Sequence, residues 1–313
     1  MGRLIGRRLL ATIPVILIVA TVVFLLLRLS PGDPATILAG DNATPEVVAS
    51  IKADLGLDRP LPMQYVIWLR EMARGNFGTS ILSKQPVMTL IRDRLEPTLV
   101  LAISAIIVTV LIAVPLGAVA AWKHNTWIDR AVMTLSVVGF SVPAFVIGYL
   151  LIMVLSVWAN LLPVQGYVSP FIDPLESLKH LILPSLALAM VFIALIARIA
   201  RSSVLEVLGE DFIRTARAKG NSEKRLLWRH ALPNAAVPIV TVIGLGIALL
   251  ISGVVVTESV FNLPGIGRLT IDAILARDYP VVQGLILFFS LIYVGVNLLI
   301  DIAYVIVDPR IRY

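Results

Sequence analysis

Hydrophobic residues along this chain gather in six long runs, which polar segments of different lengths separate. A helix that crosses a bilayer needs about 20 mainly apolar residues. The pattern therefore predicts an all-α polytopic membrane protein with six transmembrane helices. Their approximate limits are residues 9–27, 98–121, 131–158, 181–200, 235–256 and 280–307.

The longest polar segment, residues 30–97, predicts a helical region outside the membrane. Thr44-Pro45-Glu46 is a helix start with proline at the first helical position, and Gly56 ends that pattern. A second helix is expected over residues 61–74 and a shorter third one over 86–95. The apolar stripe of the second helix consists of Tyr65, Trp68, Leu69 and Met72. The segment is either a cap on the outer membrane face or a surface for an extracytoplasmic partner.

A second polar segment, residues 201–233, stands out because it is the longest in the remaining two-thirds of the chain. Its apolar spacing predicts one helix that Gly220 stops. Asn221 or Ser222 can then cap a second helix that ends at Leu232-Pro233. The residues expected on the apolar face of the first helix are Leu205, Leu208, Phe212, Thr215 and Ala216.

Two interpretations of this segment are open at this point. Its basic residues suit adsorption to anionic lipid headgroups; they are Arg214, Arg217, Lys224, Arg225 and Arg229. The small residues Ala216, Ala218 and Gly220 make a poor membrane anchor and favour insertion into the groove of another protein.

Composition supports the membrane assignment, and the distribution of basic residues among the loops predicts the orientation of the chain in the membrane. The 313 residues are 58% hydrophobic and 15% charged, which excludes an ordinary soluble domain. Fifteen of the 26 lysines and arginines lie at the two termini, in the loops after the second and fourth runs, or, for Arg198, at the end of the fourth run, against three in the loops after the third and fifth. The positive-inside rule therefore predicts both termini in the cytoplasm. The net charge of +6 has this origin and predicts no nucleic-acid partner.

The first run predicts an uncleaved span, because no small-residue cleavage pattern follows it. Ionisable residues are nearly absent from the interior of the runs, with Asp301 in the sixth as the exception. Asp301, Asn297 and Ser141 are weak candidates for a substrate path. No span offers a histidine or lysine that could activate Ser141 as a nucleophile, so an intramembrane enzyme is not supported. The chain has no cysteine and three distant histidines, which predicts no metal site.

The segment 201–233 contains a spaced signature. Its residues Arg214-Thr215-Ala216, Gly220 and His230-Ala231-Leu232-Pro233 resemble the cytoplasmic-loop signature of membrane subunits in bacterial binding-protein-dependent ABC importers. That signature reads Glu-Ala-Ala, three residues, Gly, nine residues, Ile-x-Leu-Pro; the departures are Arg214, Thr215 and His230. The run Arg-Thr-Ala-Arg-Ala-Lys-Gly is similar to the version in the dipeptide/oligopeptide/nickel subfamily. Further stretches that resemble this subfamily are 31–34, 258–268, 277–283 and 308–312.

The resemblance implies the fold of a type I ABC importer permease. Residues 1–29 would form a cytoplasmic tip and the first transmembrane helix, 30–97 a periplasmic helical segment, and 98–313 a five-helix core with an ATPase-coupling loop at 201–234. The coupling residues that it implies are Asp211, Arg214, Thr215, Ala216, Ala218, Lys219, Gly220, Leu232 and Pro233.

The same resemblance implies an importer in the bacterial cytoplasmic membrane, driven by ATP and used for di- or oligopeptides. Its partners would be a second homologous permease in a heterodimer, two cytoplasmic ABC ATPases and a periplasmic or lipid-anchored binding protein. The chain has no Gly-x4-Gly-Lys-Ser/Thr loop, so ATP and magnesium would bind the ATPases, and this chain would bind no cofactor and catalyse no reaction. Nickel complexes, glutathione and other small solutes are alternative substrates. An ion-coupled secondary transporter is the alternative from a different class.

Overall fold

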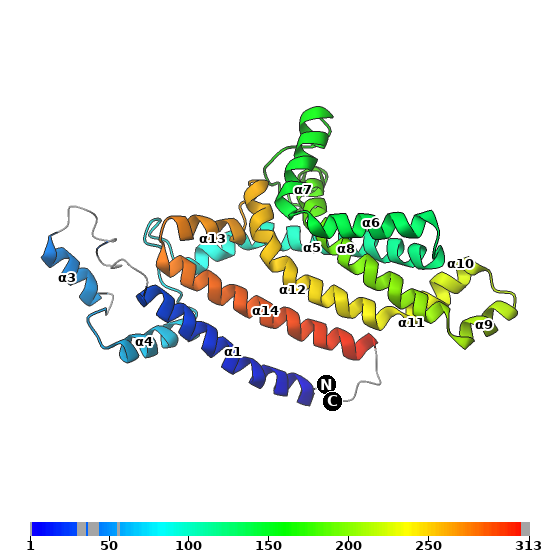
Figure 1. Cartoon of the computed structure of the whole chain (residues 1–313). Helices are drawn as coiled ribbons and strands as arrows, with labels where there is room; N and C mark the ends of the chain where they lie inside the picture. The colour runs from blue at the N-terminus through cyan, green and yellow to red at the C-terminus, as the bar shows by residue number, and fades with distance from the viewer. Residues whose placement is uncertain (1, 30–35, 37–43, 55–56, 308–313) are drawn as a thin grey trace. The chain divides into compact units, whose positions relative to one another are not determined.

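The computed structural model describes residues 2–29, 36, 44–54 and 57–307, and within these ranges every regular element is a helix (Figure 1). Gly56 and the stretches 31–34 and 308–312 lie outside the described residues. The chain divides into two compact units: Met1–Leu95 with Leu269–Val294, and Glu96–Arg268 with Gly295–Tyr313.

In chain order, the first helices are α1 (Gly2–Leu29), α3 (Pro45–Asp54), α4 (Leu61–Ala73) and α5 (Val87–Trp122). The middle of the chain forms α6 (Trp127–Ser141), α7 (Ala144–Leu151), the π-helix η1 (Ile152–Trp158) and α8 (Pro174–Leu208). The remaining elements are α9 (Asp211–Ala218), α10 (Glu223–Arg225), the π-helix η2 (Leu226–Ala231), α11 (Leu232–Asn234), α12 (Ala236–Val260), α13 (Ile266–Leu275) and α14 (Tyr279–Val307).

In the first unit, an aromatic contact joins α4 to α1. The ring of Phe24 is 2% exposed and lies edge-on to Tyr65, with 5.2 Å between the centroids, and 5.6 Å from Trp68. The hydroxyls of Thr21 and Tyr65 are 2.8 Å apart, within hydrogen-bonding distance. The predicted second helix is therefore confirmed, and its aromatic stripe packs as an amphipathic face should. The predicted helix start at Pro45 is confirmed as well.

A buried carboxylate in the same unit holds the connection that precedes α14. Asp278 is buried and accepts hydrogen bonds from the hydroxyl of Ser80 and from the backbone N–H groups of Ile81 and Leu82. A carboxylate with several donors keeps its charge satisfied away from water. This contact explains why an aspartate stands inside the 277–283 stretch noted in the sequence.

Helix α5 runs unbroken from Val87 to Trp122 and passes through Pro97 and Pro115. The third helix predicted over residues 86–95 is present from Val87, but it does not end at residue 95, because it continues without a break as α5. The sequence has no glycine between that stretch and the second apolar run. A proline alone removes a single backbone hydrogen bond, which long apolar helices tolerate.

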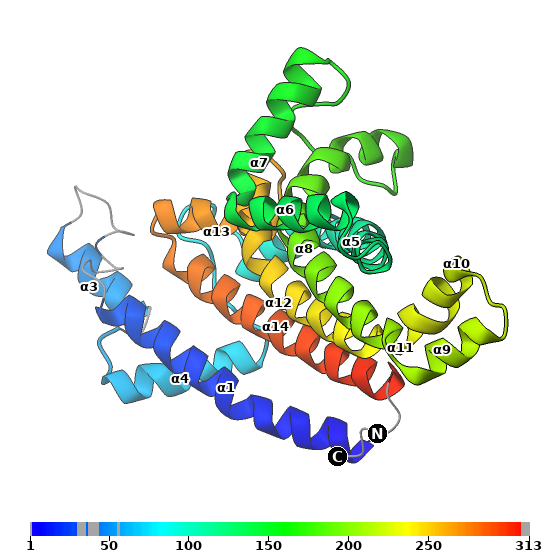
Figure 2. The same cartoon turned by 45° about the vertical axis from the view of Figure 1, so that its right-hand side comes forward.

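Helix α8 forms the centre of the second unit, and α6 and α12 pack along it (Figure 2). Small residues on α8, such as Ala187 and Ala197, are almost fully buried and let neighbouring helices approach closely. One close approach is at Gly117 of α5, where a Cβ would lie 2.5 Å from the carbonyl oxygen of Ala197. Only glycine fits at that crossing.

The third apolar run is bent, although the sequence predicted one span over residues 131–158. It divides into α6, which ends at Ser141, and α7, which begins at Ala144, with an angle of 105° between the two parts. Pro143 has no N–H to donate, and the preceding Val142 has the extended backbone (φ −93°, ψ 125°) that a following proline favours. The predicted span is therefore not one continuous helix but is broken at this proline.

Three helices in the described residues are long and apolar enough to cross a membrane: Val87–Trp122, Pro174–Leu208 and Tyr279–Ile300. The number rises to five if two bent pairs each count as one span. The second pair joins Glu223–Asn234 to Ala236–Ile247 at an angle of 62°. In α1, the apolar part covers Leu10–Leu25.

Candidate functional site

The polar segment after α8 folds into a helical hairpin made of α9, α10, η2 and α11, here called the 211–234 hairpin. Its two arms are joined across the turn by Arg217, whose Nε lies 2.6 Å from Glu223 Oε1, and by the Asn221 side-chain amide, which donates to the carbonyl of Ala216 at 2.9 Å. The turn contains Gly220 at φ +83°, in the left-handed region. A helix, a glycine turn and a second helix were predicted here, and all three are present.

The start of the hairpin differs from the prediction. One helix was expected from Leu205 to Gly220, but α8 ends at Leu208 and α9 begins only at Asp211. Gly209 and Glu210 form the break, and Glu210 occupies the N-cap position of α9. The sequence carried a usable signal: a glycine followed by acidic residues ends one helix and begins the next.

The apolar face of the hairpin is anchored by Ile213 and not by the predicted Phe212. Ile213 is fully buried, whereas Phe212 is 44% exposed. The break at Gly209 changes the phase of the helix, so the predicted face from Leu205 to Ala216 is not continuous. Ile213 packs in one cluster with residues from α5, α8, η2 and α12: Ala118, Ala121, Ala200, Val204, Leu227, Ala231, Ala235 and Ile239.

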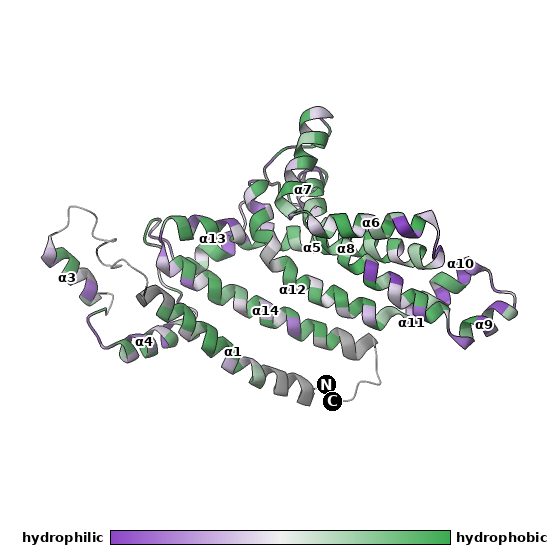
Figure 3. Cartoon of the chain, in the orientation of Figure 1, coloured by the Kyte–Doolittle hydropathy of each residue, from purple (hydrophilic) through white to green (hydrophobic). Residues whose placement is uncertain are grey.

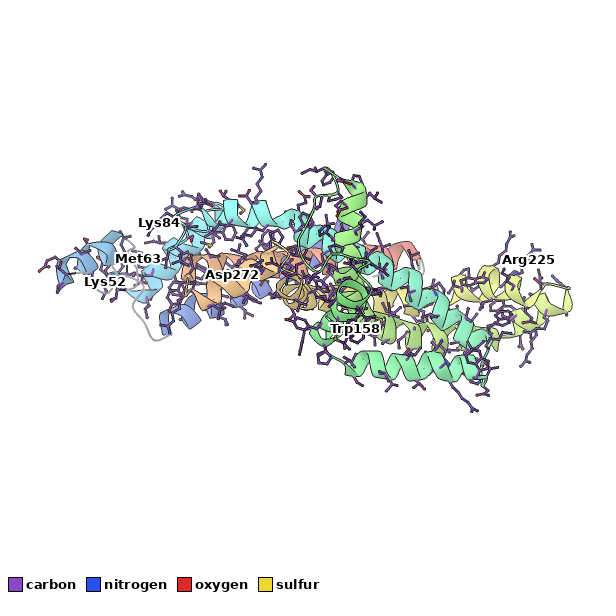
Figure 4. All side chains as sticks on the ribbon, turned by 90° about the horizontal axis from the view of Figure 1, so that it is seen from above. Lys52, Met63, Lys84, Trp158, Arg225 and Asp272 are labelled. Atoms are coloured by element: carbon purple, nitrogen blue, oxygen red, sulfur yellow. The ribbon has the colours of Figure 1, made fainter. Side chains whose placement is uncertain are left out.

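The polar residues of the hairpin face outward. The side chains of Asp211 and Arg214 are 94% and 72% exposed and form an ion pair at 3.2 Å. Hydrophilic residues are frequent on α9 and α10 (Figure 3), and Figure 4 shows the exposed Arg225 on the outer side of the hairpin. Of the predicted coupling residues, Ala216 and Leu232 are half-buried and the remainder are exposed: Asp211, Arg214, Thr215, Ala218, Lys219, Gly220 and Pro233.

The caps of the second arm also differ from the prediction. Ser222 stands at the N-cap position of α10, but its side chain makes no capping hydrogen bond. Asn221 instead closes the end of α9. The helix ends at Asn234, one residue beyond the predicted stop at Leu232-Pro233, because Pro233 lies in the first turn of α11, where proline needs no N–H donor. The Glu223 carboxylate raises the pKa of the Arg217 guanidinium, mainly through their hydrogen bond.

The bend between α6 and α7 borders a cavity of about 310 Å³. Ser141 lies at its rim, and its hydroxyl donates to the Val137 carbonyl at 2.8 Å. The other lining residues are mainly apolar: Phe140, Val142, Pro143, Ala144, Leu188, Val191, Phe192 and Gly253. Asn297 is half-buried on α14 and is not among them, and the side chain of Asp301 lies outside what the structure describes. Of the three residues predicted to line a substrate path, Ser141 alone is among the residues that line this cavity.

Glu258 is a buried carboxylate that the sequence placed beyond the fifth span. Helix α12 extends to Val260, and Glu258 is fully buried. Its carboxylate accepts a hydrogen bond from Thr98 Oγ1 at 2.6 Å and another from the backbone N–H of Arg268 at 2.9 Å. A Cβ at Gly265 would overlap this carboxylate. The 258–268 stretch thus contains the buried carboxylate of Glu258 and the glycine-containing turn that packs against it.

Comparisons with known proteins agree with this architecture. Residues 113–313 match the family of the binding-protein-dependent transport system inner membrane component, and residues 1–102 match the N-terminal family of the corresponding membrane component. A probable peptide ABC transporter permease protein of Sinorhizobium fredii is 51% identical over 313 residues, which cover both chains completely. A glutathione transport system permease protein of Salmonella choleraesuis is 45% identical over 307 residues, which cover 98% of each chain.

Proposed function

Because the chain belongs to the family of binding-protein-dependent transport system inner membrane components and is a permease subunit of an ABC importer of the peptide family, we propose that the 211–234 hairpin is the docking surface for its ATPase. The observation that carries this proposal is the two-sided character of the hairpin. Its exposed side is polar and compact, whereas its buried side packs against α5, α8 and α12. A force applied to the exposed side therefore reaches three long helices at once.

The coupling role falls on the residues that the hairpin exposes near its turn, from Asp211 to Gly220. Small side chains at Ala216 and Ala218 leave the backbone accessible, as a groove in a partner requires. Leu232 and Pro233 begin the last turn before the 62° bend into α12. A displacement of the hairpin would rotate α12 about this bend, in the manner of hinge movements between packed helices.

The transported solute is proposed to be a di- or oligopeptide. The named relatives concern peptide and glutathione transport, and glutathione is itself a small peptide. The cavity at the α6–α7 bend has the size of small-ligand pockets and offers mostly apolar walls, which suit uncharged side chains. Nickel complexes and other small solutes are the alternatives within the same importer class.

The topology that we propose has six spans in the bacterial cytoplasmic membrane with both termini inside. The three long helices, the bent pair Trp127–Trp158, α12 and α1 together supply six segments. Residues 30–97 would lie outside, residues 98–313 would form the permease core, and the loop 201–234 would face the cytoplasm, where its basic residues satisfy the positive-inside rule.

The proposed complex contains a second permease, two cytoplasmic ATPases and an extracytoplasmic binding protein. ATP and magnesium would bind the ATPases, and this chain would supply the path and the hairpin. Apolar side chains exposed on α6 and α7, such as Leu135, Phe140 and Tyr149, provide a face for lipid or for the second permease.

Reconstitution of the complete complex in proteoliposomes tests this function. Uptake of a dipeptide is expected to require both ATP and the binding protein, to stop with a non-hydrolysable ATP analogue, and to persist when a protonophore collapses the proton gradient. Competition with oligopeptides, glutathione and nickel complexes then ranks the substrates. Uptake that continues without ATP and collapses with an ionophore would instead establish an ion-coupled transporter.

A further inference from the structure

An ion pair between a buried carboxylate and a half-buried guanidinium ties the beginning of α6 to α8. Asp129 is 3% exposed, and its carboxylate receives both Nε and Nη2 of Arg201, the latter at 2.8 Å. The backbone N–H of Asn125 donates to Asp129 Oδ2 at 3.0 Å, and His124 Nδ1 lies 3.2 Å from the same oxygen. Two parallel hydrogen bonds between a guanidinium and a carboxylate fix distance and orientation together. The pair joins residues 72 positions apart in the sequence.

Arg201 stands next to the residues that hold the 211–234 hairpin. Its neighbours on α8, Ala200 and Val204, belong to the cluster in which Ile213 is buried. The C-terminal part of α8 therefore has two contacts: it packs against the apolar side of the hairpin, and it forms the ion pair with Asp129. Movement of the hairpin that displaces this end of α8 must displace Asp129 as well.

Helix α6 then leads from the ion pair to the cavity. It starts at Trp127 and ends at Ser141, and from Asp129 to Ser141 it spans about 18 Å at the rise of an α-helix. Along this length α6 packs against α8, with Gly139 opposite Ala194. Apolar helix contacts permit small sliding movements. The bidentate pair resists such sliding at one end, because a shift would break both hydrogen bonds to the buried Asp129 carboxylate.

We infer that Asp129 and Arg201 are positioning residues that transmit the movement of the 211–234 hairpin to α6, and so to the rim of the cavity at Ser141. This inference rests on the proposed function, since the hairpin moves only if an ATPase docks on it. The pair itself touches neither the ATPase surface nor the cavity. The ion pair keeps α6 and α8 from sliding along each other while the hairpin displaces α8.

The test measures peptide uptake and ATP hydrolysis in the same reconstituted complex. In Asp129→Asn we expect the uptake per ATP hydrolysed to fall roughly fivefold or more, the usual lower range for coupling between two sites, while ATP hydrolysis continues. The exchanged pair Asp129→Arg with Arg201→Asp should recover part of this ratio. Lys179→Gln is the matched control, because it removes an exposed ion pair with Glu176 near the other end of α8, and its ratio should equal that of the unaltered protein.

A purely structural role predicts something different. Uptake and hydrolysis would then fall together, in proportion to the amount of assembled complex, and an unchanged ratio would overturn the inference. An equal loss in Lys179→Gln would overturn it as well. If Asp129→Asn does not assemble, Arg201→Lys keeps the charge without the bidentate geometry, and its ratio decides. Failure of the proposed function itself would be distinguishable, because the unaltered complex would then show no ATP-dependent uptake.

Discussion

Replacing Gly220 by valine is expected to reduce ATP-dependent uptake by about 5- to 30-fold. Gly220 has φ +83° and joins the two arms of the 211–234 hairpin. The left-handed backbone conformation costs a non-glycine residue about 1–2 kcal/mol in conformational free energy, and this conformation is least favourable for β-branched residues. Such a cost lowers the ratio of the native turn to other turn conformations by that factor, which sets the upper limit of the expected loss. Initial rates of peptide uptake at limiting ATPase concentration give the measurement.

Gly220→Asn is the matched control for this change. Asparagine tolerates the left-handed region, and this chain already uses it at Asn125, Asn160 and Asn262 with positive φ. A Cβ at Gly220 meets no atom of this chain within 4 Å. Uptake by Gly220→Asn should therefore stay within about twofold of the unaltered protein. Equal uptake by the valine and asparagine variants would contradict the assigned role of the turn.

Gly117→Ala is expected to destabilise the second unit by about 1–3 kcal/mol, the usual cost of overfilling a packed interior. A Cβ at this position would lie 2.5 Å from the backbone oxygen of Ala197 and 2.7 Å from the Ala200 Cβ. Neither atom can move without shifting α8. The thermal midpoint of the purified protein in detergent should fall by several degrees.

Gly139→Ala is the control for Gly117→Ala, because it also replaces a glycine inside a helix but introduces no steric overlap. Gly139 also faces α8, but there a Cβ would lie 3.6 Å from Ala194, an ordinary contact. Alanine is a better helix former than glycine by about 0.5–1 kcal/mol, so this variant should be as stable as the unaltered protein or more stable. A similar loss of stability in both variants would show that the close α5–α8 crossing is not what Gly117 permits.

Local signals in the sequence were sufficient for several elements. Pro45 marked the beginning of α3, and Tyr65 and Trp68 marked the face of α4 that packs against α1, because helix caps and apolar periodicity act over a few residues. Gly220 marked the turn of the hairpin for the same reason. The membrane class followed from the length of the apolar runs.

Contacts between distant residues were beyond such reasoning. Nothing near Asp129 indicates Arg201, and nothing near Glu258 indicates Thr98, because these pairs meet only after the helices pack. The size of the bend at Pro143 could not be predicted either, since a proline inside an apolar run can lie within an unbroken helix, as Pro115 does, or at a break. Surroundings and not residue type decide between the two outcomes.

The central claim is that the 211–234 hairpin contacts the ATPase, and photo-crosslinking tests it most directly. The chain contains no cysteine, so Ala218→Cys provides a single site for a benzophenone maleimide on the exposed arm of the hairpin. Phe171→Cys, at an 87% exposed position before α8, provides the control. Irradiation of the assembled complex should join the ATPase to this chain from position 218 and not from 171. No crosslink from 218, or equal crosslinking from both positions, would contradict the account.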